Sequence, residues 1–163
     1  MQYGFFDDAR AEYVVTRPDT PTPWINYLGF GKFGGIVSQS GGGYCFDRDP
    51  RNRRVTRYRY NAVPVDQPGR YLYIRDKETG EFWSATWQPV KGKLDQYECR
   101  HGLGYTSIKA SKHGVNTEVV FFVPDGAAAE VWGLHISADR PRQLQIFTYV
   151  EFCHYDAVQD QED

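Results

Sequence analysis

Short runs of alternating side chains, separated by turn residues, dominate this chain from residue 55 to residue 152. They lie at residues 55–60, 70–75, 81–87, 103–110, 115–123, 130–137 and 143–152. Successive side chains of a strand point to opposite faces, so a period of two residues is typical of β-strands. No segment shows the longer period of an amphipathic helix. The sequence therefore predicts an all-β protein, with seven or more strands in an antiparallel sandwich or meander.

Turn residues stand between these runs where hairpins require them. Residues 76–80 end in Gly80, which can adopt the positive φ of a hairpin loop. Residues 111–114 end in Gly114 in the same way. We therefore expect an antiparallel hairpin around each of these two loops.

Several of the runs are apolar on both faces. Val119 and Phe121 fall on one face of the run at 115–123, and Val120 and Phe122 fall on the other. Strands of this kind are covered on both sides. We expect a large layered sandwich, or a sandwich that another domain covers.

The first 50 residues carry a different pattern. Residues 18–23 contain three prolines, a density that excludes a helix and an inner strand. Residues 29–43 contain seven glycines. This composition predicts irregular backbone that is packed tightly against a neighbour, or long mobile loops.

Length and charge restrict the class of protein. A chain of 163 residues fits one domain. A net charge of −2 with 25% charged residues excludes a disordered chain and a strongly basic nucleic-acid binder. We therefore expect no nucleic-acid partner. The aromatic share of 16% favours β structure.

The chain also lacks sorting and metal-binding signals. Residues 1–8 have neither the basic start nor the apolar stretch of a signal peptide, and no apolar run approaches the length of a membrane helix. We therefore expect no contact with a membrane. Cys45, Cys99 and Cys153 are widely spaced, so we expect free thiols in a reducing cytoplasm. No Cys or His stands at ligand spacing from another, so we expect no metal site.

Six arginines lie between residues 48 and 59. Arginine pairs bidentately with carboxylates and phosphates and stacks on aromatic rings. The cluster indicates a contact with an anion or a sugar phosphate, or a subunit interface. The alternative is a solvated strand face paired with nearby acids, such as Asp47, Asp49 and Asp66. The candidates that we single out are Arg53, Arg54, Arg57 and Arg59.

Two tryptophans in the run at 81–87 are candidates for saccharide contact. Trp83, Ala85 and Trp87 are expected on one face of a strand. A flat aromatic ring stacks on the apolar face of a sugar, while nearby polar groups bind its hydroxyls. The alternative is that Trp83 and Trp87 are core or domain-interface residues.

No group of residues forms a recognisable catalytic centre. No serine occupies a nucleophile elbow, and Gly41-Gly42-Gly43 leads into Tyr44 rather than into a phosphate-binding lysine. Asp7 and Asp8 are adjacent, so on a strand they point to opposite faces. The residues alone indicate an aromatic-rich β domain related to saccharides.

Several motifs taken together resemble one known family. They lie at residues 3–8, 12–16, 21–29, 41–46, 53–61, 68–71, 82–89 and 100–106, and include Thr22-Pro23-Trp24-Ile25-Asn26-Tyr27 and Arg100-His101-Gly102-Leu103-Gly104-Tyr105. In this order they closely resemble the amino-terminal part of glycoside hydrolase family 94, the cellobiose phosphorylase family. The resemblance covers residues 3–157, essentially the whole chain.

The resemblance implies both a fold and a reaction. Members of the family begin with a mutarotase-like β-supersandwich, which is followed by an (α/α)6 barrel. As glycosyltransferases of carbohydrate metabolism they cleave β-linked disaccharides with inorganic phosphate as the co-substrate and with inversion. A cellobiose-type member would release α-glucose 1-phosphate and glucose, and the resemblance implies that the reaction needs no metal and no organic cofactor.

On this resemblance, residues 1–163 are an incomplete amino-terminal sandwich without the barrel that carries the general acid. We therefore expect no catalytic residue in the chain and a structural or dimerisation role in a parent homodimer. Trp83, Trp87 and the arginines at 53–59 become candidates for the surface toward the parent's own barrel or the partner subunit. The alternative is a stand-alone saccharide-binding sandwich. Because uncovered apolar surface is unfavourable in water, we also expect limited solubility of the isolated chain.

Overall fold

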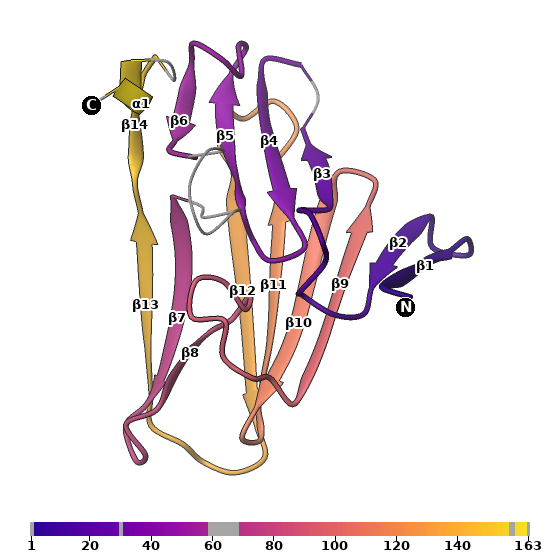
Figure 1. The fold of residues 1–163 in the computed structure, drawn as a ribbon, viewed down its shortest axis with the longest axis vertical. Helices are drawn as coiled ribbons and strands as arrows, with labels where there is room; N and C mark the ends of the chain where they lie inside the picture. The colour runs from indigo at the N-terminus through magenta and orange to yellow at the C-terminus, as the bar shows by residue number, and fades with distance from the viewer. Residues whose placement is uncertain (1, 30, 59–68, 157–158, 163) are drawn as a thin grey trace.

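The computed structural model describes residues 2–29, 31–58, 69–156 and 159–162, and these form antiparallel sheets in two layers (Figure 1). One layer is a six-stranded sheet. In spatial order its strands are β1 (Gly4–Asp7), β2 (Glu12–Val15), β9 (Gln96–Gly102), β10 (Tyr105–Lys112), β11 (Val115–Phe122) and β12 (Val131–Ala138). The predicted all-β sandwich class is confirmed.

Two smaller sheets form the other layer. One contains β13 (Leu144–Val150), β7 (Arg70–Asp76) and β8 (Phe82–Ser84). The other contains β14 (Phe152–Tyr155), β6 (Arg54–Thr56), β5 (Gly43–Asp47), β4 (Phe33–Ser38) and β3 (Ile25–Leu28). Strands β13 and β14 follow each other directly, so one line of chain borders both sheets (Figure 1).

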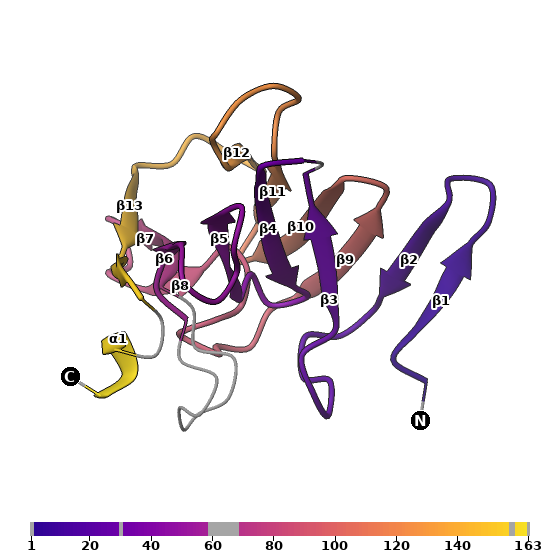
Figure 2. The same ribbon diagram turned by 90° about the horizontal axis from the view of Figure 1, so that it is seen from above.

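The short helix α1 (Gln159–Glu162) follows β14 near the carboxyl end of the chain (Figure 2). Among the described residues no helix is long and apolar enough to cross a membrane.

The hydrophobic core lies between the two layers. The six-stranded sheet contributes Val15, Cys99, Ile108, Val115, Val119 and Phe121 to it. Leu28 and Val37 enter from the five-stranded sheet, and Leu72, Ile74 and Trp83 from the three-stranded sheet. Alternation along the strands fixes this arrangement, because every second residue of β11 faces inward.

Both predicted hairpins are present. Strands β10 and β11 pair from Tyr105↔Phe122 to Lys112↔Val115, and only His113 and Gly114 lie between them. Both turn residues have positive φ, as in a type I′ turn. The backbone twist of this turn matches the right-handed twist of the two strands that it joins. Strands β7 and β8 pair around the loop that ends at Gly80, which has a φ of 76°.

The prediction of irregular backbone for residues 29–43 is wrong in the middle of this segment. Residues Phe33–Ser38 form β4, an inner strand of the five-stranded sheet. Its glycines allow close approach of neighbouring chains: a Cβ on Gly34 would lie 3.0 Å from the ring of Phe46, and one on Gly35 would lie 2.5 Å from the carboxylate of Glu130. The expected tight packing is therefore present, but the segment that packs tightly against its neighbours is the strand β4 rather than irregular backbone.

The predicted strand at residues 81–87 is shorter than expected. Strand β8 ends at Ser84, and Trp87 adopts a φ of 77°. Trp83 and Ala85 are buried in the core, whereas Trp87 has left the strand. The prediction of one shared face therefore holds only for the first two residues.

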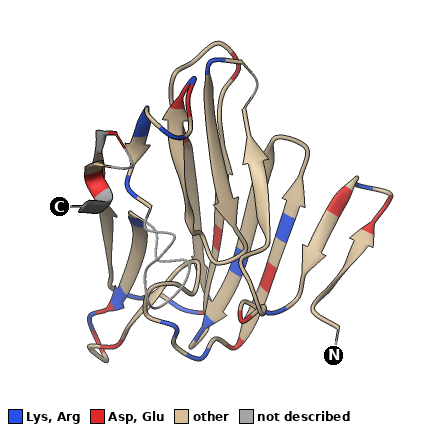
Figure 3. Cartoon of the chain, turned by 45° about the horizontal axis from the view of Figure 1, so that its top comes forward, with Lys and Arg blue, Asp and Glu red and all other residues tan. Residues whose placement is uncertain are grey.

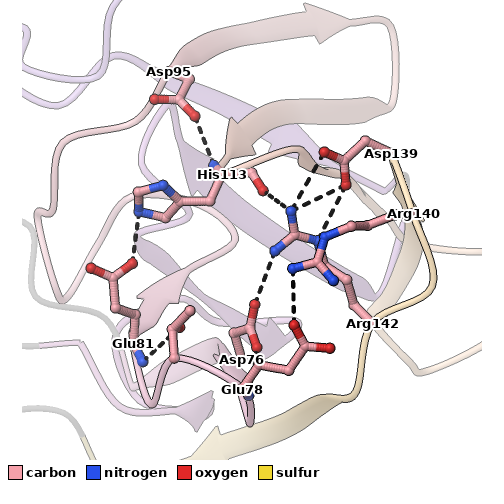
Figure 4. Close-up of polar contacts among 9 residues, drawn as sticks. Asp76, Glu78, Glu81, Asp95, His113, Asp139, Arg140 and Arg142 are labelled. Atoms are coloured by element: carbon pink, nitrogen blue, oxygen red, sulfur yellow. Dashed lines mark hydrogen bonds and ion pairs between the residues drawn. The ribbon is translucent and has the colours of Figure 1, made fainter.

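A polar cluster closes one end of the sandwich (Figure 4). The Arg142 guanidinium binds Asp76 at 3.1 Å and Asp139 at 3.1 Å, and it donates to the backbone carbonyl of His113 at 2.5 Å. The His113 ring in turn lies 2.7 Å from the carboxylate of Glu81. These contacts join the loops after β7, β10 and β12, which are far apart in the sequence.

The β13–β14 border leaves apolar side chains in solvent. Ile146, Phe147, Tyr149 and Val150 of β13 are exposed, and Phe152 of β14 is 68% exposed. β13 pairs with β7 on one side, and no described strand pairs with its other side. This combination of an open edge and exposed apolar side chains is typical of an interaction surface.

Candidate functional site

The predicted arginine cluster lies on and beside the β5–β6 hairpin. Arg53 lies 3.4 Å from Asp47, as the solvated-face alternative expects. Arg54 is buried, with its guanidinium 4.3 Å from the centre of the Tyr44 ring and its Nε donating to the carbonyl of Pro50 at 2.8 Å. Arg59 lies outside the described residues.

Arg57 contacts acids that are distant in the sequence. It donates to Glu151 Oε1 at 3.0 Å, and its Nε lies 2.7 Å from Asp160 Oδ2. The pKa of Arg57 is raised, chiefly by its hydrogen bond to Glu151. This arginine therefore fastens the segment around α1 to the five-stranded sheet, a role that no short-range pattern indicates.

The two predicted tryptophans do not share a surface. Trp83 is 2% exposed and belongs to the core. Trp87 is half-buried in a cleft of about 230 Å³ beside the proline segment, with Lys91 Nζ 5.6 Å from its ring centre. They also lie on other elements than the arginines, so the predicted site residues do not converge on one place.

A further hollow lies away from these residues, beside the hairpin formed by β1 and β2. This hairpin projects from the body of the sandwich in both ribbon views (Figures 1 and 2). A groove of about 530 Å³ separates it from β3 and from the turn between β9 and β10. We call this hollow the hairpin groove; its lining includes Phe6, Asp8, Tyr13, Trp24, Asn26 and Leu103.

Aromatic rings form the wall of the hairpin groove. Tyr13 makes edge contacts with Phe6, at 4.7 Å between ring centres, and with Trp24, at 5.7 Å. Tyr3 contacts Trp24 from another side at 5.9 Å. At the rim, Phe6 is 75% exposed and Leu103 is 85% exposed. Exposed apolar residues around a hollow are characteristic of a binding surface.

A directed chain of hydrogen bonds forms the floor. Asn26 Nδ2 lies 3.3 Å from Thr106 Oγ1, and Thr106 Oγ1 lies 2.9 Å from His101 Nδ1. His101 Nε2 lies 3.1 Å from the carbonyl oxygen of Trp24, which can only accept. Nε2 therefore carries the imidazole proton, and Nδ1 accepts from the Thr106 hydroxyl.

The imidazole of His101 stays neutral because of its surroundings. Burial lowers the pKa of His101 to about 4. A charged imidazole would lose hydration, and it would also lose its acceptor nitrogen opposite Thr106. His101 is thus a positioning group of the floor rather than a proton-transfer group near neutral pH.

Charged groups surround Arg100 at the base of the hairpin, on the outer face of the sheet. Arg100 Nη1 lies 2.7 Å from Glu12 Oε2 and 3.1 Å from Asp7 Oδ2. Hydrogen bonding from Arg100 is the main cause that lowers the pKa of Asp7. The hydroxyl of Tyr105 donates to the second carboxylate oxygen of Glu12. This hydrogen bond lowers the pKa of Glu12 and raises the pKa of Tyr105. These carboxylates are therefore ionised at neutral pH, and the hairpin is acidic on both strands (Figure 3).

This arrangement is suited to binding rather than to bond cleavage. The buried imidazole is neutral, and the carboxylates Asp7 and Glu12 are held ionised by Arg100 and Tyr105. A general acid at neutral pH needs a raised pKa, as in inverting hydrolysis. Within the described part of the chain, no group of three metal-ligating side chains lies together.

Sequence patterns missed the hairpin groove for a clear reason. Its members come from segments near residues 6, 13, 24 and 102, and register between distant strands brings them together. The available signal was the aromatic-rich sequence of residues 3–27, which carries three aromatic residues that line the groove, Phe6, Tyr13 and Trp24.

The chain is similar to known proteins over its whole length. The family model described as glycosyl hydrolase 94, supersandwich domain, matches residues 11–163. An N,N'-diacetylchitobiose phosphorylase from Vibrio furnissii is 46% identical over 167 residues, which covers 100% of this chain and 21% of that protein. A 3-O-beta-D-glucopyranosyl-beta-D-glucuronide phosphorylase from Paenibacillus borealis is 36% identical over 148 residues, covering 90% of this chain and 18% of that protein.

A third relative is named as a different kind of enzyme. The cyclic beta-(1,2)-glucan synthase NdvB from Rhizobium meliloti (strain 1021) is 29% identical over 153 residues, covering 91% of this chain and 5% of that protein. The chain spans about one fifth of the length of the two phosphorylases.

Proposed function

The chain belongs to the glycosyl hydrolase 94 supersandwich domain family, and from this premise we propose that it is the non-catalytic sandwich domain of an inverting disaccharide phosphorylase. The observation that carries the proposal is the family match over residues 11–163 of a chain that spans only a fifth of its phosphorylase relatives. The general acid then resides in the remaining four fifths of the parent, in the catalytic barrel that the family resemblance implies.

The proposed reaction transfers a glycosyl group to phosphate. A phosphate oxygen forms a bond to the anomeric carbon as the bond to the glycosidic oxygen breaks, and the leaving oxygen takes a proton from the general acid. Attack from the opposite face converts a β-linkage into an α-1-phosphate. Phosphate supplies its own negative charge, so the reaction needs one acid and space for the nucleophile.

We propose a β-linked disaccharide as the parent's substrate, with N,N'-diacetylchitobiose as the first to test. Two relatives that are each 46% identical, from Vibrio furnissii and Vibrio proteolyticus, are named N,N'-diacetylchitobiose phosphorylases. Cellobiose, the disaccharide that the sequence motifs suggested, is the second candidate. Relatives near 36% identity carry other disaccharide names, so identity in this domain supports the class more than the sugar.

The sandwich contributes docking surfaces in this proposal. The exposed apolar side chains of the β13–β14 border and the open side of β13 suit further strands of the same domain. Arg57 binds Asp160 of α1 and so keeps this helix against the five-stranded sheet, near β14. The homodimer and the cytoplasmic location expected from sequence belong to the same proposal.

A comparison of two proteins tests this function. The first is the 163-residue chain, and the second is the protein encoded by the complete gene. With N,N'-diacetylchitobiose or cellobiose and phosphate, the complete protein should release an α-1-phosphate, detected by phosphorus NMR, and the chain alone should not. Turnover by the chain alone would contradict the non-catalytic role, and a complete protein inert toward both sugars would contradict the proposed substrates.

A further inference from the structure

We propose that the hairpin groove binds one ring of a neutral saccharide. The groove joins the aromatic wall of Tyr13 and Trp24 to a polar floor at Asn26. The choice of sugar rests on the proposed function, but the site itself follows from the geometry described here.

The size and the wall fit a sugar ring. A hollow of about 530 Å³ lies within the range of small-molecule sites and exceeds the volume of one hexose. Sugars present apolar C–H faces that pack on aromatic side chains. The edge contacts among Phe6, Tyr13 and Trp24 fix these rings relative to one another, so the wall exists before a ligand arrives.

The floor offers an oriented acceptor. Asn26 Nδ2 has three acceptors nearby, at 2.9 Å (Gly102 O), 2.9 Å (Tyr105 O) and 3.3 Å (Thr106 Oγ1). These contacts hold the amide in one orientation. In the described part of the chain no donor pairs with its other atom, Oδ1, which is therefore available to accept a proton from a sugar hydroxyl.

The charged side chains around the hairpin groove favour a neutral ligand over an anionic one. Asp7, Asp8 and Glu12 all line the groove, and two cations lie beside them: Arg100 is bound to Asp7 and Glu12, and Arg10 is bound to Asp7. An anionic ligand such as a sugar phosphate would meet net negative charge at short range. The uncharged hydroxyls of a sugar can instead donate to the Asp8 carboxylate.

An apolar protein segment fits the same hollow less well. It would cover Asn26 Oδ1 and the Asp8 carboxylate without giving either a hydrogen-bond donor, and unsatisfied buried acceptors are unfavourable. A sugar satisfies both the aromatic wall and the acceptors. We therefore assign the groove to a saccharide rather than to a protein partner.

The test is an NMR titration of the 163-residue chain with N,N'-diacetylchitobiose, with cellobiose and with α-glucose 1-phosphate. Saturable shifts are expected at Asn26 and Leu103 with either neutral disaccharide, and weaker binding is expected with the phosphate. The double variant Phe6→Ala/Asp8→Ala changes two exposed side chains of the groove and should weaken binding about tenfold or more.

A matched control keeps the result interpretable. Phe82→Ala/Asp125→Ala removes the same two side-chain types at exposed positions outside the groove, and it should leave binding unchanged. Circular dichroism confirms that each variant is folded. Absence of binding by the folded chain, equal binding by both double variants, or preference for the phosphate would each overturn the assignment.

Two further outcomes separate the proposals. If no sugar binds but groove variants alter sedimentation of the chain, the groove is a protein contact and the saccharide assignment is overturned. If the chain binds sugar through the groove while the complete protein shows no phosphorolysis, the site stands and only the proposed enzymatic function fails.

Discussion

The guanidinium of Arg70 lies 2.7 Å from the carboxylate of Glu130, and both side chains are almost completely buried between the two layers. Arg70 belongs to β7, whereas Glu130 directly precedes β12 in the opposite layer. Arg70 also donates to the carbonyl of Ile36 at 2.9 Å, and Trp132 Nε1 donates to Glu130 at 2.6 Å. A single buried ion pair therefore links both layers of the sandwich.

Removal of one partner of this pair should destabilise the fold strongly. Glu130→Leu leaves the Arg70 charge buried without its counterion, which costs about 3–5 kcal/mol in other proteins. Urea denaturation measures the change in the free energy of unfolding. Lys109→Ala is the control, because the Lys109–Glu118 pair is at 3.6 Å and half exposed, and such a change costs less than about 1 kcal/mol. Similar losses in both variants would contradict the linking role.

The two tryptophans of the sequence 82–89 should differ in their effect on stability. Trp83→Ala opens a cavity in the core and should cost about 3–5 kcal/mol. Trp87→Ala removes a half-buried ring and a contact with Lys91, worth about 1 kcal/mol or less. Thermal unfolding of the two variants side by side measures the difference. Equal melting temperatures would show that Trp83 is not part of the core.

His101 should make stability fall as the pH falls. Its pKa in the folded chain is about 4, below its ordinary value of 6.5. Between these values the unfolded chain binds a proton that the folded chain does not bind, so the free energy of unfolding decreases toward low pH. The full loss for this pKa difference is of the order of 3 kcal/mol.

Urea titrations of the His101→Gln variant from pH 7 to pH 4 test this dependence. The variant should show a flatter pH dependence, while His135→Gln, a change at an exposed histidine, should behave like the unmodified chain. A His101 resonance that titrates near its ordinary value in NMR spectra would contradict the burial argument.

Gly43 should tolerate no side chain. Its φ is 110°, and a Cβ would lie 1.9 Å from the carbonyl oxygen of Ile36. Gly80 also has a positive φ but has nothing within 4 Å of a Cβ position. Gly80→Ala should therefore cost only the backbone strain, about 1–2 kcal/mol, and Gly43→Ala should cost clearly more. Chemical denaturation compares the two, and equal losses would contradict the close approach.

The β13–β14 border should drive self-association of the chain. Ile146→Lys/Phe152→Lys places charge on this apolar surface and should raise solubility and reduce aggregation. Light scattering after size-exclusion chromatography measures the effect. Asn52→Lys/Asp125→Asn changes the net charge by the same two units at exposed positions without removing apolar area, and it serves as the control. If both variants behave alike, net charge rather than the border controls solubility.

Local patterns predicted much of this fold. The period of two residues located β7, β10, β11, β12 and β13, and Gly80 and Gly114 marked two hairpin turns. These features depend on neighbouring residues only, because alternation and turn φ are set within a few peptide units. The strand β4 escaped the pattern, because its glycines are explained only by the ring of Phe46 and the carboxylate of Glu130 that approach them.

Local sequence was sufficient to predict the all-β class, two hairpin turns, the approximate positions of β7 and of β10 to β13, and the resemblance to the family. The three-dimensional structure was needed to show which strands pair, that Arg57 binds Glu151 and Asp160, and that Trp83 is buried whereas Trp87 is half-buried. It also placed Asn26, Thr106 and His101 in one hydrogen-bonded chain. The Asn26–Thr106, Arg57–Glu151 and Arg57–Asp160 contacts join residues 80, 94 and 103 positions apart. Their geometry follows from sheet register and core packing, which no local pattern encodes.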